Sequence, residues 1–262
     1  MNHPKILNSK ILEEIERLYH KEKLSLKEVA KKTGISVYLI RHNISNIRKS
    51  GDSHALNCER NSVALTYEQR QLILGSLLGD SSIYHSKQGT DIFQVSHCLK
   101  QKEYLEYKAN LLKSPIFTMI GGKNSFSEGK VFYKTYYSNK YQLKDIRKLV
   151  CLNGKKTVTK EWLDQVDIGG ISYWFFDDGW SYYRKDGAGG VTTNFATNCF
   201  SRNEIELMQN KLLEFNIQTS INHASNNKGL ILYIKNCSNN NFMDLIEPYA
   251  VDCMKYKIKR RK

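Results

Sequence analysis

Apolar residues are most continuous in two short segments of the chain, Ile73–Ser81 (ILGSLLGDS) and Ile171–Gly179 (ISYWFFDDG). Each run is typical of a buried helix, and each ends in a carboxylate followed by a small residue. The runs start 171 − 73 = 98 residues apart, about the size of a small domain. This repetition predicts a duplicated element whose terminal acids, Asp80 and Asp178, meet at one pseudo-symmetric site.

Strand-like and helix-like stretches follow each run in the same order. In the first half, the pattern predicts strands over 83–86, 92–97 and 131–137 and helices over 102–112 and 141–152. In the second half, it predicts strands over 181–184, 191–197, 217–222 and 230–234 and helices over 203–215 and 242–249. We therefore expect an α+β fold of two αββαββα halves, each with a curved antiparallel sheet whose polar face is open to a ligand.

The first fifty residues have a helical periodicity of their own. Ser25 and Glu28 form a capping box, and Ser36 is placed to cap a third helix that we expect to continue through Arg48. A short helix, a glycine turn and a basic last helix favour a DNA-binding helix-turn-helix over an unspecialised three-helix bundle. Its outward side chains would include Arg41, His42 and Asn46.

Changes in composition predict the domain boundaries. We expect an all-α helix-turn-helix module over residues 1–50 and a polar, aperiodic linker over 51–66. The first half would cover 67–160. The second half would cover 161–262 and end in a tail with six basic residues and no acid.

The charge of the chain narrows the class of partner. The 262 residues carry 40 Lys+Arg against 26 Asp+Glu, a net charge of +14. Such an excess favours a polyanion, above all nucleic acid, although a basic protein without such a partner remains the alternative. The 16 tyrosines suit backbone contacts and base stacking. The expected partner is double-stranded DNA.

Cysteine spacing and hydropathy exclude other classes. The six cysteines form no CxxC pair and no zinc spacing with histidine, so we expect reduced, mostly buried thiols. No apolar stretch reaches the length that spans a membrane, and the first residues have no signal-peptide core. These features predict an intracellular protein of a bacterial or phage cytoplasm or an organelle matrix, not a secreted one.

The two terminal acids carry the chemistry. If the two helices pack side by side, Asp80 and Asp178 project into the same space and repel one another. A divalent cation relieves this repulsion, and oxygen-ligated Mg²⁺ lowers the pKa of water and supports the leaving oxygen of a phosphodiester. The alternative is that both acids merely end helices in ordinary turns, which their repetition at matching positions disfavours.

The two segments resemble the paired signature of the LAGLIDADG homing endonucleases in their single-chain, two-repeat form. Further agreement comes from the stretches at 101–108, 155–158 and 249–258. The resemblance implies that the motif helices form the interface between the halves and that two saddle-shaped sheets enter the DNA major groove. It also implies a monomer that uses Mg²⁺, or Mn²⁺ in its place, to hydrolyse one phosphodiester per strand and so mobilises its encoding intron or element.

The resemblance also assigns site residues. The eighth motif position, the metal-binding acid, falls on Asp80 and Asp178, and the carbonyls of Gly79 and Asp177 would add ligands. A basic residue near each centre matches Lys140, with a one-residue gap, and Lys257; a plain phosphate contact or a surface charge is nearly as good an interpretation of either lysine. The pattern is broken by Ser81, where glycine is usual, and by Tyr173, whose bulk we expect to widen the helix spacing.

Polar residues that alternate on the predicted strands are candidates to read bases, although about half of them will face the core or the phosphates. They are Tyr84, Gln94, Lys134, Tyr136, Arg184, Asn194 and Lys235. A second class of function stays open, because the same scaffold also serves non-cleaving binders. These would be a maturase that binds its own intron RNA or a DNA-binding regulator.

Overall fold

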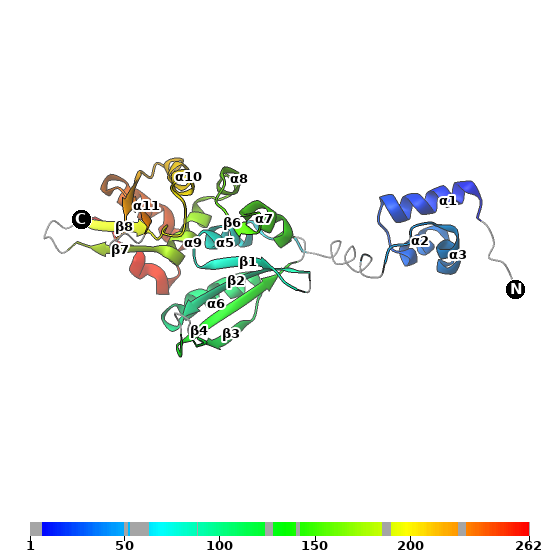
Figure 1. The fold of residues 1–262 in the computed structure, drawn as a ribbon, viewed down its shortest axis with the longest axis horizontal. Coiled ribbons are helices and arrows are strands. Elements are labelled where there is room, and N and C mark those ends of the chain that lie inside the picture. The colour runs from blue at the N-terminus through cyan, green and yellow to red at the C-terminus, as the bar shows by residue number, and fades with distance from the viewer. Residues whose placement is uncertain are drawn as a thin grey trace. The chain divides into compact units, whose positions relative to one another are not determined.

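The computed structural model describes residues 7–49, 52, 63–87, 89–123, 128–139, 142–184, 190–224 and 229–261. The chain divides into two compact units, residues 1–62 and residues 63–262. Both units are drawn in Figure 1. Each unit has a hydrophobic core of its own, so each is described by itself.

The first unit is a small helical domain. Its helices are α1 (Ser9–Glu16), continued by a π-helical turn over Arg17–Lys21, α2 (Leu26–Thr33) and α3 (Val37–Asn43). The predicted capping box at Ser25 is present, and Gly34 ends α2 with a positive φ of 70°, which favours glycine. These helices enclose a core that includes Ile15, Val29 and Ile40.

The predicted extension of the third helix to Arg48 is wrong. Ile44 is already extended, and Asn46 has a positive φ of 53°. Tertiary contacts replace the helical hydrogen bonds here: the Arg48 guanidinium donates to the carbonyl of Lys23, and it lies 3.9 Å from the centre of the Tyr19 ring. The helical spacing of Ile40, Ile44 and Ile47 therefore continues beyond the helix itself.

The second unit contains two halves with the same element order. The first half comprises α5 (Tyr67–Leu78), β1 (Ser81–His85), β2 (Asp91–Cys98), α6 (Lys102–Leu112), β3 (Ile116–Ile120), β4 (Val131–Ser138) and α7 (Gln142–Val150). The second half comprises α9 (Ile168–Asp178), β7 (Gly179–Tyr183), β8 (Val191–Phe195), α10 (Arg202–Leu213), β9 (Thr219–His223), β10 (Leu230–Ile234) and α11 (Asn239–Ile246). The predicted αββαββα order is confirmed.

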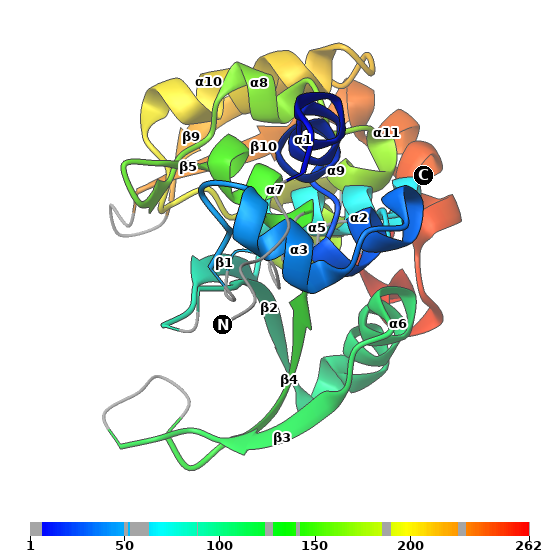
Figure 2. The same ribbon diagram turned by 90° about the vertical axis from the view of Figure 1, so that its right-hand side faces the viewer.

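Each half builds one antiparallel sheet of four strands. The strand orders are β1-β2-β4-β3 and β7-β8-β10-β9, which are equivalent. Figure 2 shows the first sheet as a curved surface with α6 along one side. Between the halves lie a two-stranded ribbon, β5 (Cys151–Leu152) with β6 (Lys155–Lys156), and a short helix, α8 (Lys160–Leu163).

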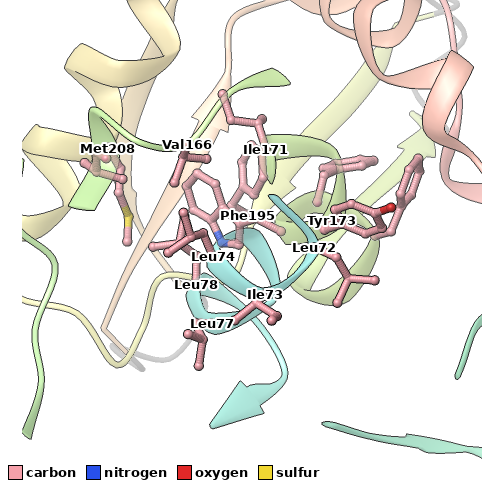
Figure 3. Packing of buried hydrophobic residues seen from close by; sticks show 14 of the residues in the cluster. Leu72, Ile73, Leu74, Leu77, Leu78, Val166, Ile171, Tyr173, Phe195 and Met208 are labelled. Carbon is pink, nitrogen blue, oxygen red and sulfur yellow. The ribbon is translucent and has the colours of Figure 1, made fainter. Parts of the chain in front are cut away.

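Buried apolar side chains of both halves form one continuous core, because α5 contacts the first sheet, α9 contacts the second, and the two helices pack against one another. Figure 3 shows Leu74 and Leu78 of α5 beside Phe195 of β8 and Met208 of α10. Aromatic rings fill the α9 side of this core: Trp174 stacks on Phe195 at 4.0 Å between ring centres. The motif helices are therefore held at the centre of the unit.

The structure corrects one expectation, adds one strand and shows how the basic tail packs. The sequence pattern gave no residue range for strand β3, because its five residues are all apolar or small and show no alternation. The cysteines are not mostly buried: among the described residues, Cys98, Cys199 and Cys237 are exposed. The basic tail is partly anchored, because Lys257 is buried and Arg260 pairs with Asp244. In the part of the chain that the structure describes, no helix is long and apolar enough to cross a membrane.

Candidate active site and nucleic-acid interface

Helices α5 and α9 pack against one another with their backbones in close contact. A Cβ atom on Gly75 would lie 1.9 Å from the backbone oxygen of Gly170, so only glycine fits at this contact. We expected the bulk of Tyr173 to widen the spacing between the two motif helices, but no widening is present at the Gly75–Gly170 contact. The Tyr173 hydroxyl lies 3.1 Å from that of Tyr107 on α6, where the ring is accommodated. The close approach brings the carboxyl ends of both motif helices together.

Asp80 and Asp178 lie at these two helix ends, close enough that the charge of Asp80 helps to raise the pKa of Asp178. Burial, together with the charges of Asp80 and Asp177, raises the pKa of Asp178 to about 7. Burial and the charge of Asp177 also raise the pKa of Asp80. Two carboxylates that resist ionising together are an arrangement that a divalent cation stabilises, and oxygen donors are the ligands that Mg²⁺, Ca²⁺ and Mn²⁺ prefer.

Asp177 belongs to a buried cluster that joins the two halves. Its carboxylate, from α9, accepts a 2.5 Å hydrogen bond from Lys108 Nζ of α6. His97 of β2 lies beside both groups, with Nε2 3.4 Å from Lys108 Nζ and 3.7 Å from Asp177 Oδ1. Burial and the charge of Lys108 lower the pKa of His97 to about 3, so the imidazole is neutral. One ligand atom from each of Asp80, His97 and Asp177 lies within 4.8 Å of the others.

Gly79, at the seventh position of the first motif, lies against this cluster. A Cβ atom there would come within 2.6 Å of the Asp177 Cβ atom. The two seventh positions therefore share one space, which the Asp177 side chain fills. The Asp177 carbonyl, predicted as a metal ligand, accepts a 3.1 Å hydrogen bond from Lys257 Nζ.

Two lysines donate hydrogen bonds to carbonyl groups at the ends of the motif helices. Lys257 is buried and donates to the carbonyls of Phe176 and Asp177, at 2.7 and 3.1 Å. Lys156 of β6 donates to the carbonyl of Leu77 at 2.8 Å and approaches that of Ser81 at 3.5 Å. Each ammonium group thus meets the negative end of a helix dipole beside the acids.

Lys156 is a residue that the sequence analysis missed as a site residue. Along the chain, Lys156 follows α7, the last helix of the first half, and Lys257 follows α11, the last helix of the second half. Lys140, predicted to be the partner of Lys257, lies outside the described residues. The signal for Lys156 was its place in the 155–158 stretch, just before the second motif.

Lys108 and His97 were also missed. Lys108 falls on the apolar stripe of α6, next to Leu105 and Leu112, where a lysine needs a buried partner. His97 has the same strand parity as Phe93 and Val95, which face the core. In each case the available signal was a polar residue at a core-facing position. The sequence does not identify the acid with which that residue pairs.

Four of the predicted base-reading residues lie on one face of the first sheet. Gln94 is paired directly with Tyr136, Lys134 with Ser96, and Tyr84 with Ile92. Since side chains alternate along a strand, this face is opposite the one that carries Phe93, Val95 and His97. The Phe117 ring, 44% exposed, extends the same face at 5.6 Å from that of Tyr136. The surface is aromatic and basic and open to solvent.

The other three predicted residues are placed less uniformly. Asn194 has the outward parity on β8, but it is only 4% exposed, with Trp180 and Tyr233 paired on either side. Arg184 directly follows β7 and is half-buried. Lys235 directly follows β10 and lines a pocket beside α10. The outward face of this sheet instead carries the side chains of Trp180 and Tyr182.

In the first unit, the predicted DNA-contacting side chains are all exposed, although Asn46 lies after α3 rather than on it. The Tyr38 ring, 59% exposed, lies 4.1 Å from the His42 ring. Charge is unevenly distributed in this unit: residues 23–49 contain seven Lys and Arg and one Glu, whereas residues 9–22 contain three Lys and Arg and four Glu. The surface that carries α2 and α3 is therefore the basic one.

Comparison with known proteins matches the motifs. The model of the LAGLIDADG DNA endonuclease family matches residues 70–242. The chain is 28% identical over 200 residues to the probable intron-encoded endonuclease 1 of Wickerhamomyces canadensis, covering 72% of this chain and 83% of that protein. It is 26% identical over 217 residues to DNA endonuclease I-ChuI of Chlamydomonas applanata, covering 75% and 96%.

Among solved structures, the homing endonuclease I-WcaI bound to its DNA recognition sequence is similar in fold. The TM-score is 0.67 at 21% identity, and the match covers 82% of this chain and 96% of that one. The resemblance read from the two motifs and the predicted fold class are both confirmed.

Proposed function

Because this chain belongs to the LAGLIDADG DNA endonuclease family and is a sequence-specific DNA endonuclease, we propose that it acts as a monomer that hydrolyses one phosphodiester on each DNA strand. The observation that carries this proposal is the close packing of α5 and α9, which brings Asp80 and Asp178, one from each half, together at the helix ends. A single chain thereby supplies both acids that two strand cuts require. Its biological role would be to mobilise the intron or element that encodes it.

The donor set fits a divalent metal, for which we propose Mg²⁺, with Mn²⁺ as a substitute. Asp80 and Asp178 would be the protein ligands, and the carbonyls of Gly79 and Asp177 lie next to them in the chain. When bound, the metal supplies a lowered pKa for a water ligand and positive charge for the leaving oxygen. Protons bound to the acid pair would compete with the metal, because the pKa of Asp178 is raised to about 7.

Lys156 and Lys257 would support the reaction electrostatically. Their ammonium groups are fixed by the helix-end carbonyls that they cap. Fixed positive charges beside the scissile phosphate stabilise the charge that develops in the transition state, without reorganisation. The hydrogen bonds to these carbonyls hold both ammonium groups in place as fixed positive charges. Lys140 remains a candidate, from its sequence position, for the basic residue of the first centre. Lys156 is the stronger candidate because it contacts the end of α5.

The sheet faces would read the DNA site. Tyr84, Gln94, Lys134 and Tyr136 share one open face, which suits contacts along a major groove. In the second half, Arg184, Asn194 and Lys235 remain candidates. Asn194 would need its aromatic neighbours to move before it could reach a base, since its side chain is nearly covered.

We propose that the first unit is a second DNA-binding module, with Arg41, His42 and Asn46 at its contact surface. The exposure of all three and the basic character of residues 23–49 support this. A nuclease footprint of the non-cleaving Asp80→Asn protein tests the idea. Replacing Arg41 and His42 by alanine should shorten the footprint and lower the salt dependence of affinity, because phosphate contacts are lost.

The decisive experiment is cleavage of a randomised double-stranded DNA library with Mg²⁺, followed by sequencing of the cut ends. We expect discrete cuts within one long motif, and a loss of about 10²–10³-fold in rate in Asp80→Asn and in Asp178→Asn. Asp164→Asn is the matched control, because that exposed carboxylate pairs only with Lys160 among the described residues. Specific binding without any cutting would instead favour the maturase or regulator, and binding of the encoding intron RNA would then be measured.

A further inference from the structure

His97 is placed like a ligand rather than like a structural histidine. Its side chain is 1% exposed, and its Nδ1 atom is buried without a hydrogen-bond partner among the described residues. Buried polar atoms are nearly always hydrogen-bonded, so an imidazole nitrogen left open inside a site requires an explanation. Asp177 Oδ2, in the same cluster, is open in the same way.

The open nitrogen faces Asp80. His97 Nδ1 lies 3.5 Å from Asp80 Oδ2, which is long for a hydrogen bond. It is, however, the separation of two ligands of one cation: donors about 2.1 Å from an ion, at an angle of roughly 90–110°, are about 3.0–3.5 Å apart. The geometry between the two side chains is therefore that of a metal site.

The other ring nitrogen has a suitable partner. Nε2 lies 3.4 Å from Lys108 Nζ, from which it accepts a hydrogen bond, and 3.7 Å from Asp177 Oδ1. Binding of an ion to Nδ1 would move the ring proton to Nε2, on the side of that carboxylate. A histidine that binds a metal through one nitrogen usually donates its other N–H group to such an acceptor. Lys108 Nζ, 2.5 Å from the same oxygen, balances the charge of that carboxylate. Asp177 would thus hold the ring in place rather than bind the ion itself.

The site is also open to an incoming ion. Asp80 and His97 line a groove of about 580 Å³, together with Ser96, Gln101 and Lys134. Lys134 belongs to the sheet face that we assign to DNA. An ion could therefore enter beside Asp80 from the side on which DNA would bind.

We propose that His97 is a direct metal ligand of the first active centre, binding through Nδ1 to the same ion as Asp80. This rests on the proposed role of Asp80 as a metal ligand. All three ions prefer oxygen donors, but an imidazole ligand is less unfavourable for Mn²⁺, which is a transition-metal ion, than for Ca²⁺ and Mg²⁺. The two centres of this enzyme would then differ in metal preference.

Pulsed electron paramagnetic resonance tests the proposal without any cleavage assay. Mn²⁺ alone is added to the full-length protein, prepared with histidine at natural abundance and with ¹⁵N-labelled histidine. We expect a coupling from a directly bound nitrogen that changes with the isotope and is absent in His97→Gln. By calorimetry, His97→Gln should also weaken Mn²⁺ binding about tenfold and leave Ca²⁺ binding nearly unchanged.

His85→Gln is the matched control, because His85 also pairs with an aspartate, Asp91, at 2.7 Å. Its nitrogen coupling should stay as in the wild type. His97→Asn serves as a second variant, and circular dichroism confirms that each variant is folded. If the wild type binds Mn²⁺ without a nitrogen coupling, and Asp80→Asn abolishes that binding, the role of His97 is overturned and Asp80 remains a ligand. An absence of Mn²⁺ binding in the wild type would overturn both assignments.

Discussion

The strand that follows each motif helix begins in the same register: Ser81 is paired with Val95 in the first half, and Gly179 with Phe195 in the second. Two residues further along the paired segment, the first half has His97 and the second has Thr197. The Thr197 hydroxyl donates to the carbonyl of Leu230 at 2.9 Å, whereas His97 Nδ1 finds no such partner in the described chain. Equivalent positions are thus satisfied in one half and open in the other.

The helices that cover the two sheets differ in a matching way. Leu105, Lys108 and Leu112 are buried on α6 with the same spacing as Ile205, Met208 and Leu212 on α10. A lysine in the first half therefore corresponds to a methionine in the second. The seventh motif positions differ as well, since Asp177 fills the space beside Gly79.

Together, these differences place a polar cluster of Asp177, Lys108 and His97 beside the first sheet, and the pseudo-symmetric equivalents of these residues are Gly79, Met208 and Thr197. A buried ion pair adds little net stability, but removing one partner leaves an uncompensated charge. The cluster therefore makes the two centres unequal on a symmetric scaffold. Because Asp177 comes from the second half and Lys108 from the first, it also ties the halves together.

The largest expected effect comes from making the first half like the second at one position only. Lys108→Met leaves the buried carboxylate of Asp177 unpaired, so we expect the free energy of unfolding to fall by about 3–5 kcal/mol. Adding Asp177→Ala removes the orphaned charge and should restore most of that loss. Urea unfolding of the two single variants and the double variant measures the coupling.

Lys211→Met is the control for the lysine cluster. Lys211 lies on α10, is 8% exposed and pairs with the exposed Glu214. Its loss should cost less than about 1 kcal/mol, because the carboxylate that it leaves behind is exposed to water. Equal losses in Lys108→Met and Lys211→Met, with no rescue by Asp177→Ala, would contradict a structural role for the cluster.

A smaller effect concerns the repelling acids. The folded-state pKa of Asp178 is about 7, above its usual 3.8, so the folded chain holds a proton that the unfolded chain releases between these pH values. Stability of the metal-free protein should fall as pH rises through this window. Asp178→Asn avoids the penalty: it should gain about 2 kcal/mol above pH 7 and nothing below pH 4.

Thermal unfolding of wild type and Asp178→Asn from pH 4 to pH 8, in the presence of a chelator, measures this difference. Added Mg²⁺ should stabilise the wild type above pH 7 and shrink the advantage of the variant, because the cation offsets the repulsion. A pH-independent gain would mean that packing, and not charge, distinguishes the variant.

The comparison also shows what the sequence could reveal. Duplicated periodicity predicted the order of elements in both halves, because core-facing positions must be apolar whatever the details. It could not reveal that Lys108 meets Asp177, a contact between residues 69 positions apart. Nor could it locate the end of α3, where the Arg48 contacts to Tyr19 and Lys23 override the helical pattern. Long-range pairing of polar groups is set by packing, which leaves little local trace.

The smallest effect separates the two capping lysines, which tests how far the symmetry extends. Lys257 is buried and makes two hydrogen bonds within 3.1 Å, whereas Lys156 is half-buried and makes one within 3.0 Å. Removing a charged donor from a buried carbonyl lowers the free energy of unfolding more than removing a donor whose place water can take. We therefore expect Lys257→Met to lower the free energy of unfolding by about 1.5 kcal/mol and Lys156→Met by about 1 kcal/mol. Lys155→Met, at the exposed neighbouring position, should have no measurable effect in the same urea titrations; if it matched Lys156→Met, the helix-end contact would not be the cause.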